Sequence, residues 1–258
     1  MRVRLLTLNL RFGLADDGPN CWTLRKEALK ALLDRHPADV YAFQEANDFQ
    51  GDFVETLLPD FDCIGRRQPA PDFWQNNLIF FSPRWRLMAR DHFYLSPTPD
   101  IPSRLPESRW PRQCTVGRLA SATHRLTVAN THLDFSSRAQ KAGIKVILER
   151  IKGIPRTEPL VLAGDFNSAP GSVGYRLLTA GSDGFNNPFS APYPETFHGF
   201  GRSRGKGHID WILCRGPLET ISCKVVTDTF GGRYPSDHHP VTATFRLGGT
   251  RRETLESD

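Results

Sequence analysis

The sequence has no run of about 18 or more apolar residues, the length that a membrane-spanning helix needs, so we expect no membrane span. The N-terminus, MRVRLLTLNLRFG, also lacks the small-residue cleavage site of a secretory leader. Its apolar stretch is short and is interrupted by Arg4 and Asn9. We therefore interpret this segment as a first β-strand of the folded protein.

Cysteine is scarce, and its five copies form no CxxC pair. An odd number without paired spacing does not predict a disulfide framework, and no cysteine–histidine spacing predicts a zinc site. We therefore expect reduced, mostly structural thiols in a cytoplasmic protein. Internal repeats and linker-like shifts in composition are absent as well. The sequence thus predicts a single domain over residues 1–247, followed by a frayed C-terminal tail at 248–258.

Charge of one sign is not in large excess, because the formal net charge is +5. A mildly basic chain is compatible with a phosphorylated or polyanionic substrate, although many proteins without such a ligand are as basic. We find no extended basic stripe with interleaved aromatics, which would indicate a dedicated nucleic-acid groove. The basic segment 202–208 could hold an anion or could be a solvated loop. Nothing in the sequence decides the oligomeric state.

Short apolar runs and a few amphipathic segments predict a mixed α/β (α+β) sandwich. A helix is expected at Trp22–His36, where Leu24, Ala28, Leu29 and Leu32 recur at helical spacing. Further helices are expected at Asp52–Leu58, Arg138–Ile151 and Ser172–Thr179. Strands are expected at Val3–Leu8, Asp39–Phe43, Asn77–Ser82, Thr115–Ala122, Arg125–Asn130, Leu160–Ala163, His208–Cys214, Lys224–Thr229 and Val241–Leu247. The proline-rich stretch Leu95–Pro111 predicts a long loop, which in a compact domain is often functional.

Polar residues stand at the ends of most predicted strands. They are Asn9, Glu45, His132, Asp134, Asp165, Asn167, Asp210, Asp237 and His238. Because sheet proteins commonly gather ligand sites at one end of their strands, these side chains could form one site. Each fragment also has a simpler interpretation. Asp165 can be a turn former, Glu45 a solvated strand end and His132 a core histidine with its hydrogen bonds satisfied.

Asp210 is the hardest of these residues to explain as a solvent-exposed polar residue, because it lies between Ile209 and Trp211 in an apolar strand. A buried carboxylate needs a partner, either a histidine or a metal ion. Carboxylate and amide oxygens suit Mg²⁺ or Mn²⁺ rather than zinc. A histidine paired with an aspartate can act as a general acid or base. Together these groups predict metal-assisted hydrolysis of a phosphate ester.

Six short motifs occur in order along almost the whole chain. They are LTLNLR at residues 6–11, FQE at Phe43–Glu45, NTHLD at Asn130–Asp134, GDFN at Gly164–Asn167, GHIDWIL at Gly207–Leu213 and SDHHP at Ser236–Pro240. In this order they resemble the endonuclease/exonuclease/phosphatase superfamily, with its deoxyribonuclease-I-like fold. The resemblance implies a four-layer sandwich, in which two packed mixed, mainly antiparallel β-sheets are flanked by helices. Its small bacterial members, closer to the deadenylase-like branch than to the abasic-site endonucleases, are the most similar.

The resemblance also implies roles for the matching residues. Glu45 would be the main ligand of a Mg²⁺ or Mn²⁺ ion, with Asn9 in support and Asp237 as a further ligand or a supporting carboxylate. Asp165 would align or deprotonate the attacking water, and Asn167 would contact the phosphate. His132 would donate to a phosphate oxygen, and Asp210 would orient His238.

Neighbouring side chains in an extended segment point to opposite faces, so His238 and His239 should not share one task. The family register assigns the catalytic role to His238 and leaves His239 a packing or rim role. Substrate contacts are expected from Arg112, Asp134, Phe197 and His208. For Arg112, a bidentate contact with a phosphate and a solvated loop arginine are equally open.

The predicted activity is a divalent-metal-dependent phosphoesterase acting on a phosphodiester or phosphomonoester. The substrate could be nucleic acid, a nucleotide, a sugar phosphate or a lipid headgroup, because fold and mechanism do not fix it. The alternative of another class is a non-catalytic binding module on the same fold. Such a module would have lost some of the site residues, whereas here all of them are present.

Overall fold

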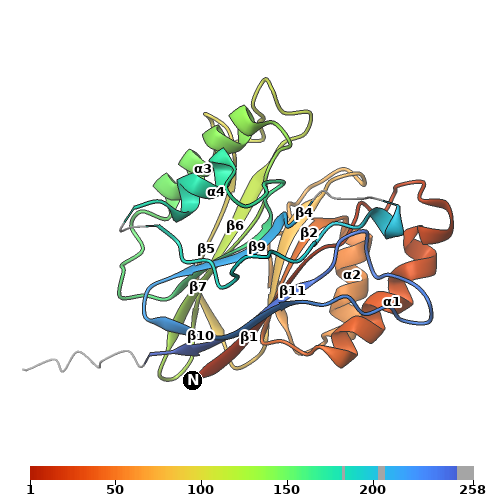
Figure 1. The fold of residues 1–258 in the computed structure, drawn as a ribbon, viewed down its shortest axis with the longest axis horizontal. Helices are drawn as coiled ribbons and strands as arrows, with labels where there is room; N and C mark the ends of the chain where they lie inside the picture. The colour runs from red at the N-terminus through yellow and green to blue at the C-terminus, as the bar shows by residue number, and fades with distance from the viewer. Residues whose placement is uncertain (182–183, 203–206, 249–258) are drawn as a thin grey trace, which may run out of the picture.

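Two β-sheets form the centre of the computed structural model, which describes residues 1–181, 184–202 and 207–248. The strands are β1 (Arg2–Asn9), β2 (Val40–Ala46), β3 (Asp62–Ile64), β4 (Asn76–Phe81), β5 (Arg86–Tyr94), β6 (Gln113–Ala120), β7 (Arg125–His132), β8 (Leu160–Asp165), β9 (Asp210–Arg215), β10 (Leu218–Val225) and β11 (Val241–Leu247). One sheet has the order β10-β11-β1-β2-β4-β3, and the other has the order β5-β6-β7-β8-β9. The two sheets pack face to face (Figure 1).

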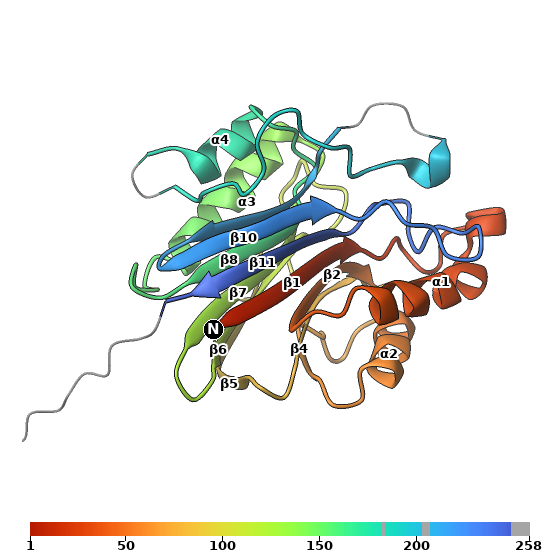
Figure 2. The same ribbon diagram turned by 60° about the horizontal axis from the view of Figure 1, so that its bottom comes forward.

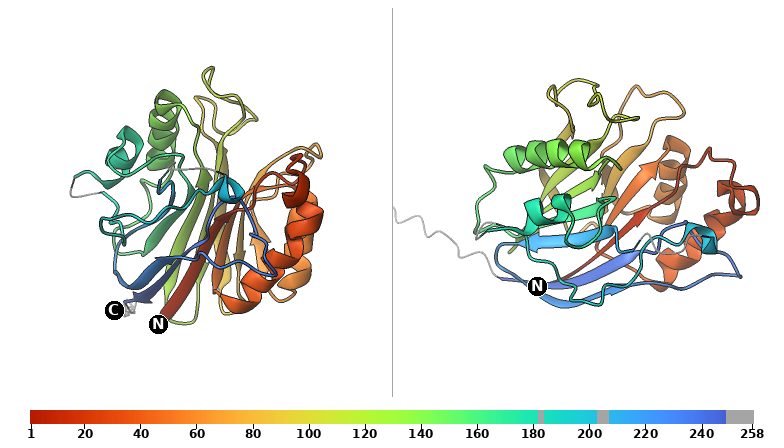
Figure 3. Two further views of the ribbon diagram at one scale, coloured as in Figure 1. Left: turned by 45° about the vertical axis from the view of Figure 1, so that its right-hand side comes forward. Right: turned by 45° about the horizontal axis from the view of Figure 1, so that its top comes forward.

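Helices cover the outer face of each sheet. They are α1 (Trp22–Arg35), α2 (Asp48–Leu57), α3 (Ser137–Arg150) and α4 (Val173–Thr179), with short 3₁₀ turns at Gly18–Asn20 and Gly199–Gly201. Figure 3 shows α1 and α2 against the sheet that contains β1, and α3 and α4 against the sheet that contains β8. The predicted four-layer sandwich of helices, two mixed sheets and helices is therefore confirmed.

The alternation of side chains along β1 explains why most of its positions from Leu5 to Leu8 are apolar. Val3 and Leu5 point into the core between the two sheets, whereas Leu6 and Leu8 pack against the helices on the outer face. Strand β8 repeats this division with Val161 inside. Both faces are buried over Leu5–Leu8 of β1 and along β8, so both segments are mainly apolar until the strand ends. Each fully buried leucine contributes roughly 1.5–3 kcal/mol to stability.

Strand direction determines where the polar strand ends meet. Strands β1 and β2 are parallel, as are β7 and β8, while all other paired strands are antiparallel. The carboxyl ends of these parallel pairs and the first residues of their antiparallel neighbours β9 and β11 therefore lie at the same edge. Figure 2 shows β1 and β11 running in opposite directions beside each other. In the second sheet, Asp165 is paired directly with Asp210 across the ladder.

Several predicted helix and strand boundaries are wrong, and two strands were missed. Helix α2 begins at Asp48 rather than Asp52, because the side chains of Asn47 and Gln50 form a capping box that starts it. The last strand before β11 covers Leu218–Val225 rather than Lys224–Thr229. Strands β3 and β5 were not predicted, since β3 is very short and β5 has polar residues and exposed positions without a regular apolar alternation.

In helix α1, the buried face differs from the one that the sequence predicted. Leu24 is exposed, whereas Arg25 is buried with Ala28, Leu29 and Leu32. The long loop at residues 95–111 contains no helix or strand, as predicted.

All five cysteines are free thiols. Within the described residues, none of the helices has the length and apolar character that a membrane crossing requires. The single domain over residues 1–247 stays a prediction, and the tail predicted at 248–258 lies outside the described residues apart from Gly248.

Candidate active site

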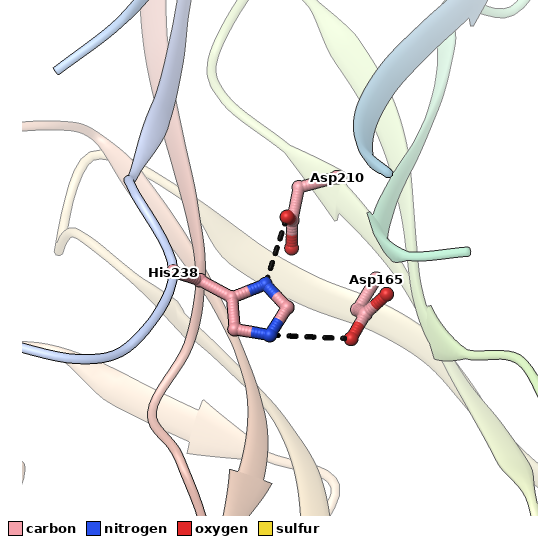
Figure 4. A group of neighbouring side chains, drawn as sticks. All are labelled: Asp165, Asp210 and His238. Atoms are coloured by element: carbon pink, nitrogen blue, oxygen red, sulfur yellow. Dashed lines mark hydrogen bonds and ion pairs between the residues drawn. The ribbon is translucent and has the colours of Figure 1, made fainter. Parts of the chain in front are cut away.

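Two aspartates and one histidine meet at this edge of the sandwich. His238 Nδ1 lies 2.8 Å from Asp210 Oδ2, and His238 Nε2 lies 3.8 Å from Asp165 Oδ2. Figure 4 shows the imidazole between the two carboxylates. All three side chains are buried, and their ligand atoms lie within 4.8 Å of one another. The arrangement suits proton exchange between the imidazole and a carboxylate or coordination of a metal ion.

The charges in this group raise the pKa of both His238 and Asp165. Burial lowers the pKa of His238, but the charges of Asp210, Asp165 and Asp237 outweigh it and raise the pKa to about 10. Burial and the neighbouring Asp210 raise the pKa of Asp165 to about 6, although His238 opposes them. His238 is therefore a proton donor that faces a carboxylate of increased basicity.

Hydrogen bonds hold the Asp165 carboxylate in a fixed orientation. The Asn9 amide donates to Asp165 Oδ2 over 3.0 Å, and the backbone N–H of Asn167 donates to Asp165 Oδ1 over 2.9 Å. The first bond joins the end of β1 to the end of β8 and thus links the two sheets. Glycine is required at position 164, because its φ is +139° and a β-carbon there would overlap the carbonyl oxygen of Thr131.

His132 occupies the opposite side of Asp165 and has a defined tautomer. Arg112 Nη1 lies 3.0 Å from His132 Nδ1, and since a guanidinium can only donate, Nδ1 must be the acceptor. Burial and the charge of Arg112 lower the pKa of His132 well below its usual value, so the ring is neutral. Its proton is therefore on Nε2, which lies 3.4 Å from Asp165 Oδ2. His132 thus presents an N–H to the centre of the site.

A second group of oxygen ligands lies beside the first. Glu45 Oε2 accepts a hydrogen bond of 2.7 Å from the backbone of Phe12. Burial and then the charge of Asp237 raise the pKa of Glu45. Placing acidic side chains together in a buried site costs free energy, which a bound cation would offset. The carboxylates of Glu45 and Asp237 with the amide oxygen of Asn9 are the hard donor set that Mg²⁺ or Mn²⁺ prefers, so these residues fit such an ion.

The backbone is strained where it carries these groups. Four described residues other than glycine have positive φ, and three of them are Arg11 at 59°, Glu45 at 57° and Asn167 at 46°. Each such conformation costs of the order of 1–3 kcal/mol and persists only where surrounding contacts hold it. At Glu45 it coincides with an irregularity in the β2–β4 register. Strain concentrated at one edge of the sandwich is typical of a functional site.

A family model for the endonuclease/exonuclease/phosphatase family matches residues 6–238, which include the first five motifs and the sixth as far as His238. The chain belongs to this family. Members of the family are phosphoesterases, and the buried group of Asp165, Asp210 and His238 lies in the matched region. Proteins of curated function gave no match to the chain.

Solved structures of the family superpose on nearly the whole chain. An endonuclease/exonuclease/phosphatase from Bacteroides vulgatus has 24% identity and a TM-score of 0.87, with 96% of this chain and 100% of that chain covered. A mannosyl-6-phosphatase from Bacteroides thetaiotaomicron has 25% identity and a TM-score of 0.86, with 95% and 100% covered. TDP2 of D. rerio, complexed with a single-stranded DNA product, has 17% identity and a TM-score of 0.77, with 95% and 99% covered.

The residues expected to contact substrate occupy different surroundings in this family fold. Arg112 is buried, and its Nε lies 3.5 Å from Asp134 Oδ2, so it is not a solvated loop arginine. Phe197 packs edge-on against the His238 ring at 4.9 Å between centroids. His208 is fully buried. Its Nδ1 lies 2.7 Å from the backbone oxygen of Pro194, and no hydrogen bond joins it to another described side chain. The contacts of His208 are those of a packing residue.

His239 lies away from the carboxylates. Its ring stacks on His198 with 4.1 Å between centroids, and Tyr234 lies edge-on at 5.9 Å. Its backbone N–H donates to Thr196 O over 2.7 Å. The two adjacent imidazoles therefore have different partners, as the alternation of an extended segment predicted.

Three residues that support the site were not predicted. The distance between Arg11 Nε and Asp237 Oδ2 is 3.7 Å. Arg25 donates hydrogen bonds to the backbone carbonyls of Pro235 and Arg11. The hydroxyl of Thr196 accepts from the backbone of Ile209 and Asp210, over 2.9 Å and 3.0 Å. Only Arg25 carries a signal in the sequence, since it is a charged residue three positions before Ala28 on an apolar helix face.

Proposed function

We propose that this chain is a divalent-metal-dependent phosphoesterase that hydrolyses its substrate by attack of a water molecule activated by Asp165. The proposal rests on one observation. The buried carboxylate of Asp165 lies between the neutral His132 and the protonated His238, and Asn9 ties it to the neighbouring group of oxygen ligands. This arrangement supports the assignment of a base, an acid and a cation site to one buried edge. We further propose that the enzyme is cytoplasmic, consistent with its five free thiols.

Each residue receives a role from its contacts. Asp165, whose pKa of about 6 makes it a usable base near neutral pH, orients and deprotonates the water. His238, held by Asp210, donates a proton to the departing oxygen. His132 Nε2–H and the Asn167 amide donate to phosphoryl oxygens. A Mg²⁺ or Mn²⁺ ion held by Glu45, Asn9 and Asp237 would stabilise the negative charge that develops on the phosphoryl group.

The similar structures support a phosphate ester as the substrate and leave its class open. One of them is a mannosyl-6-phosphatase, and another binds a single-stranded DNA product. Both phosphomonoesters and phosphodiesters are therefore candidate substrates. The same chemistry directed at a lipid headgroup is an alternative substrate assignment.

The alternative of another class is a binding module that has kept the fold without turnover. The connected donor set argues against it, because a module that only binds has no need of a basic carboxylate fixed beside a protonated histidine. Strain stored at Glu45 and Asn167 would also be lost readily in a chain that no longer catalyses.

A metal-dependent activity panel tests the proposal. The panel contains DNA, RNA, bis-p-nitrophenyl phosphate, small phosphomonoesters and sphingomyelin, each with Mg²⁺ or Mn²⁺. We expect turnover of at least one ester, its loss with a chelator and its recovery on adding metal. Calorimetric binding of the metal without turnover of any ester would instead favour the binding module.

A further inference from the structure

A cavity of about 710 Å³ opens beside the candidate active site. Glu45, Arg11 and Arg112 form part of its wall, so it is continuous with the proposed metal site and with the partner of His132. Its volume falls within the range of roughly 300–1,000 Å³ that small-molecule sites occupy. The proposed chemistry uses only this polar side of the cavity and leaves the remainder unexplained.

Aromatic side chains line the rest of the cavity. They are Phe12, Phe73, Trp74, Trp110 and Phe135. Three of them are unusually exposed for large apolar groups, with relative exposures of 61% for Phe73, 48% for Trp110 and 68% for Phe135. Leaving rings of this size in water forfeits the hydrophobic stabilisation that burial would give. Their convergence on one cavity therefore indicates a ligand that covers them.

Arginines lie over three of these rings. The guanidinium carbon is 4.3 Å from the ring centroid for Arg67 over Trp74, and 5.1 Å for Arg109 over Trp110. For Arg112 over Phe135 the distance is 5.5 Å. The positive charges make the surroundings of the cavity favourable to an anionic ligand. This interleaving of basic and aromatic side chains comes from three separate segments, so no stripe along the sequence reveals it.

The composition of the wall selects the kind of group that fits. Among the described residues that line the cavity, Pro111 is the one aliphatic side chain, and leucine, isoleucine, valine and methionine are absent. Alkyl chains have no preference for aromatic walls, whereas flat rings stack on them, with roughly 1–3 kcal/mol per base for nucleobases.

We propose that this aromatic cavity binds the base of a nucleotidyl substrate whose phosphate lies against Glu45 and Arg112. The inference rests on the proposed phosphoesterase function for the position of the phosphate, and it assigns the substrate class. The base stacks on Trp110, which lies in the proline-rich loop, and on Phe135, which follows the end of β7. Mononucleotides and the ends of single-stranded nucleic acid share this chemistry.

Binding of AMP and ribose 5-phosphate tests the inference, because the two ligands differ only in the adenine base. Calorimetry is performed with Mg²⁺ on the full chain carrying Asp165→Asn, so that neither ligand is consumed. We expect AMP to bind at least about tenfold more tightly, in line with one stacked base. Adding Trp110→Ala and Phe135→Ala should remove this advantage. Ile221→Ala, which truncates an exposed apolar residue of β10 outside the cavity, should preserve it.

Equal affinities for AMP and ribose 5-phosphate would overturn the inference, as would tighter binding of hexyl phosphate than of AMP. A further gain for pentathymidylate over dTMP would identify single strands as the source of the base, and no gain would identify mononucleotides. These binding results do not depend on turnover. AMP could therefore bind no more tightly than ribose 5-phosphate although the panel shows turnover of an ester. Conversely, AMP could bind more tightly although the panel shows no turnover.

Discussion

At the scale of single residues, the environment of each histidine decides what it can do. The two ring nitrogens of His238 face Asp210 and Asp165, whereas the ring of His239 stacks on His198 and meets Tyr234 edge-on. Burial lowers the pKa of His239, so its ring is neutral. One imidazole is thus placed for proton transfer and its neighbour for packing, although only one peptide bond separates them.

We predict that His238→Ala lowers kcat by about 10²–10⁴-fold, as removal of a general acid does, while His239→Phe changes it little. The phenyl ring can retain the stacking on His198. Steady-state kinetics of both variants on the best ester of the panel measure this difference. Similar losses in the two variants would show that the register of the motif has been misassigned.

At the scale of elements, helix α1 organises two loops of the site through one buried arginine. Arg25 donates to Pro235 O over 2.8 Å, to Arg11 O over 3.0 Å and to Asn20 O over 3.1 Å. Burial lowers the pKa of Arg25 to about 10, although Asp237 opposes the shift. The fork of the guanidinium is suited to several carbonyls at once, so Arg25 positions the segments that carry Asp237 and Arg11.

We predict that Arg25→Lys lowers the free energy of unfolding by roughly 1–3 kcal/mol and also reduces kcat/KM, because an ammonium group leaves at least one buried carbonyl unsatisfied. Denaturant titration and kinetics measure the two effects. Arg35→Lys, at an exposed position of the same helix, is the matched control and should change neither. Wild-type stability together with wild-type kcat/KM in Arg25→Lys would refute the positioning role.

The strands that the sequence predicts best are those that are buried on both faces. Strand β8 has an uninterrupted apolar run and β1 is mainly apolar from Leu5 to Leu8, and the polar residue that ends each strand enters the site. Strands β5 and β10 escape prediction because water covers much of their surface and leaves little pattern. The aromatic cavity could not be predicted from local patterns either, since Trp74, Trp110 and Phe135 meet only through tertiary structure.

At the scale of the whole molecule, several histidine side chains are neutral in the folded protein because they are buried. Burial lowers the pKa of His208 to about 4, and burial followed by the charge of His239 lowers that of His198 to about 3. In the unfolded chain both have an ordinary pKa near 6.5. A depressed pKa in the folded state means that the unfolded chain takes up more protons as the pH falls. Their contribution to stability is present above about pH 6.5 and is lost progressively below it.

We predict that the free energy of unfolding falls between pH 7 and pH 5, with on the order of 2 kcal/mol from His208 alone. His208→Asn keeps a donor for Pro194 O and removes the titrating group, so its stability should depend less on pH. Urea titrations at both pH values measure the difference. An unchanged pH dependence in this variant would contradict the assignment of a neutral buried His208.

The central claim is that Asp165 is the base of a phosphoesterase, and the turnover of Asp165→Asn tests it most directly. Asparagine retains the shape of the side chain but cannot accept a proton, so we predict a loss of about 10²–10⁴-fold in kcat on the best ester of the panel with saturating Mg²⁺ or Mn²⁺. Asp60→Asn, at an exposed position, should retain full activity. Undiminished turnover in Asp165→Asn would contradict the account.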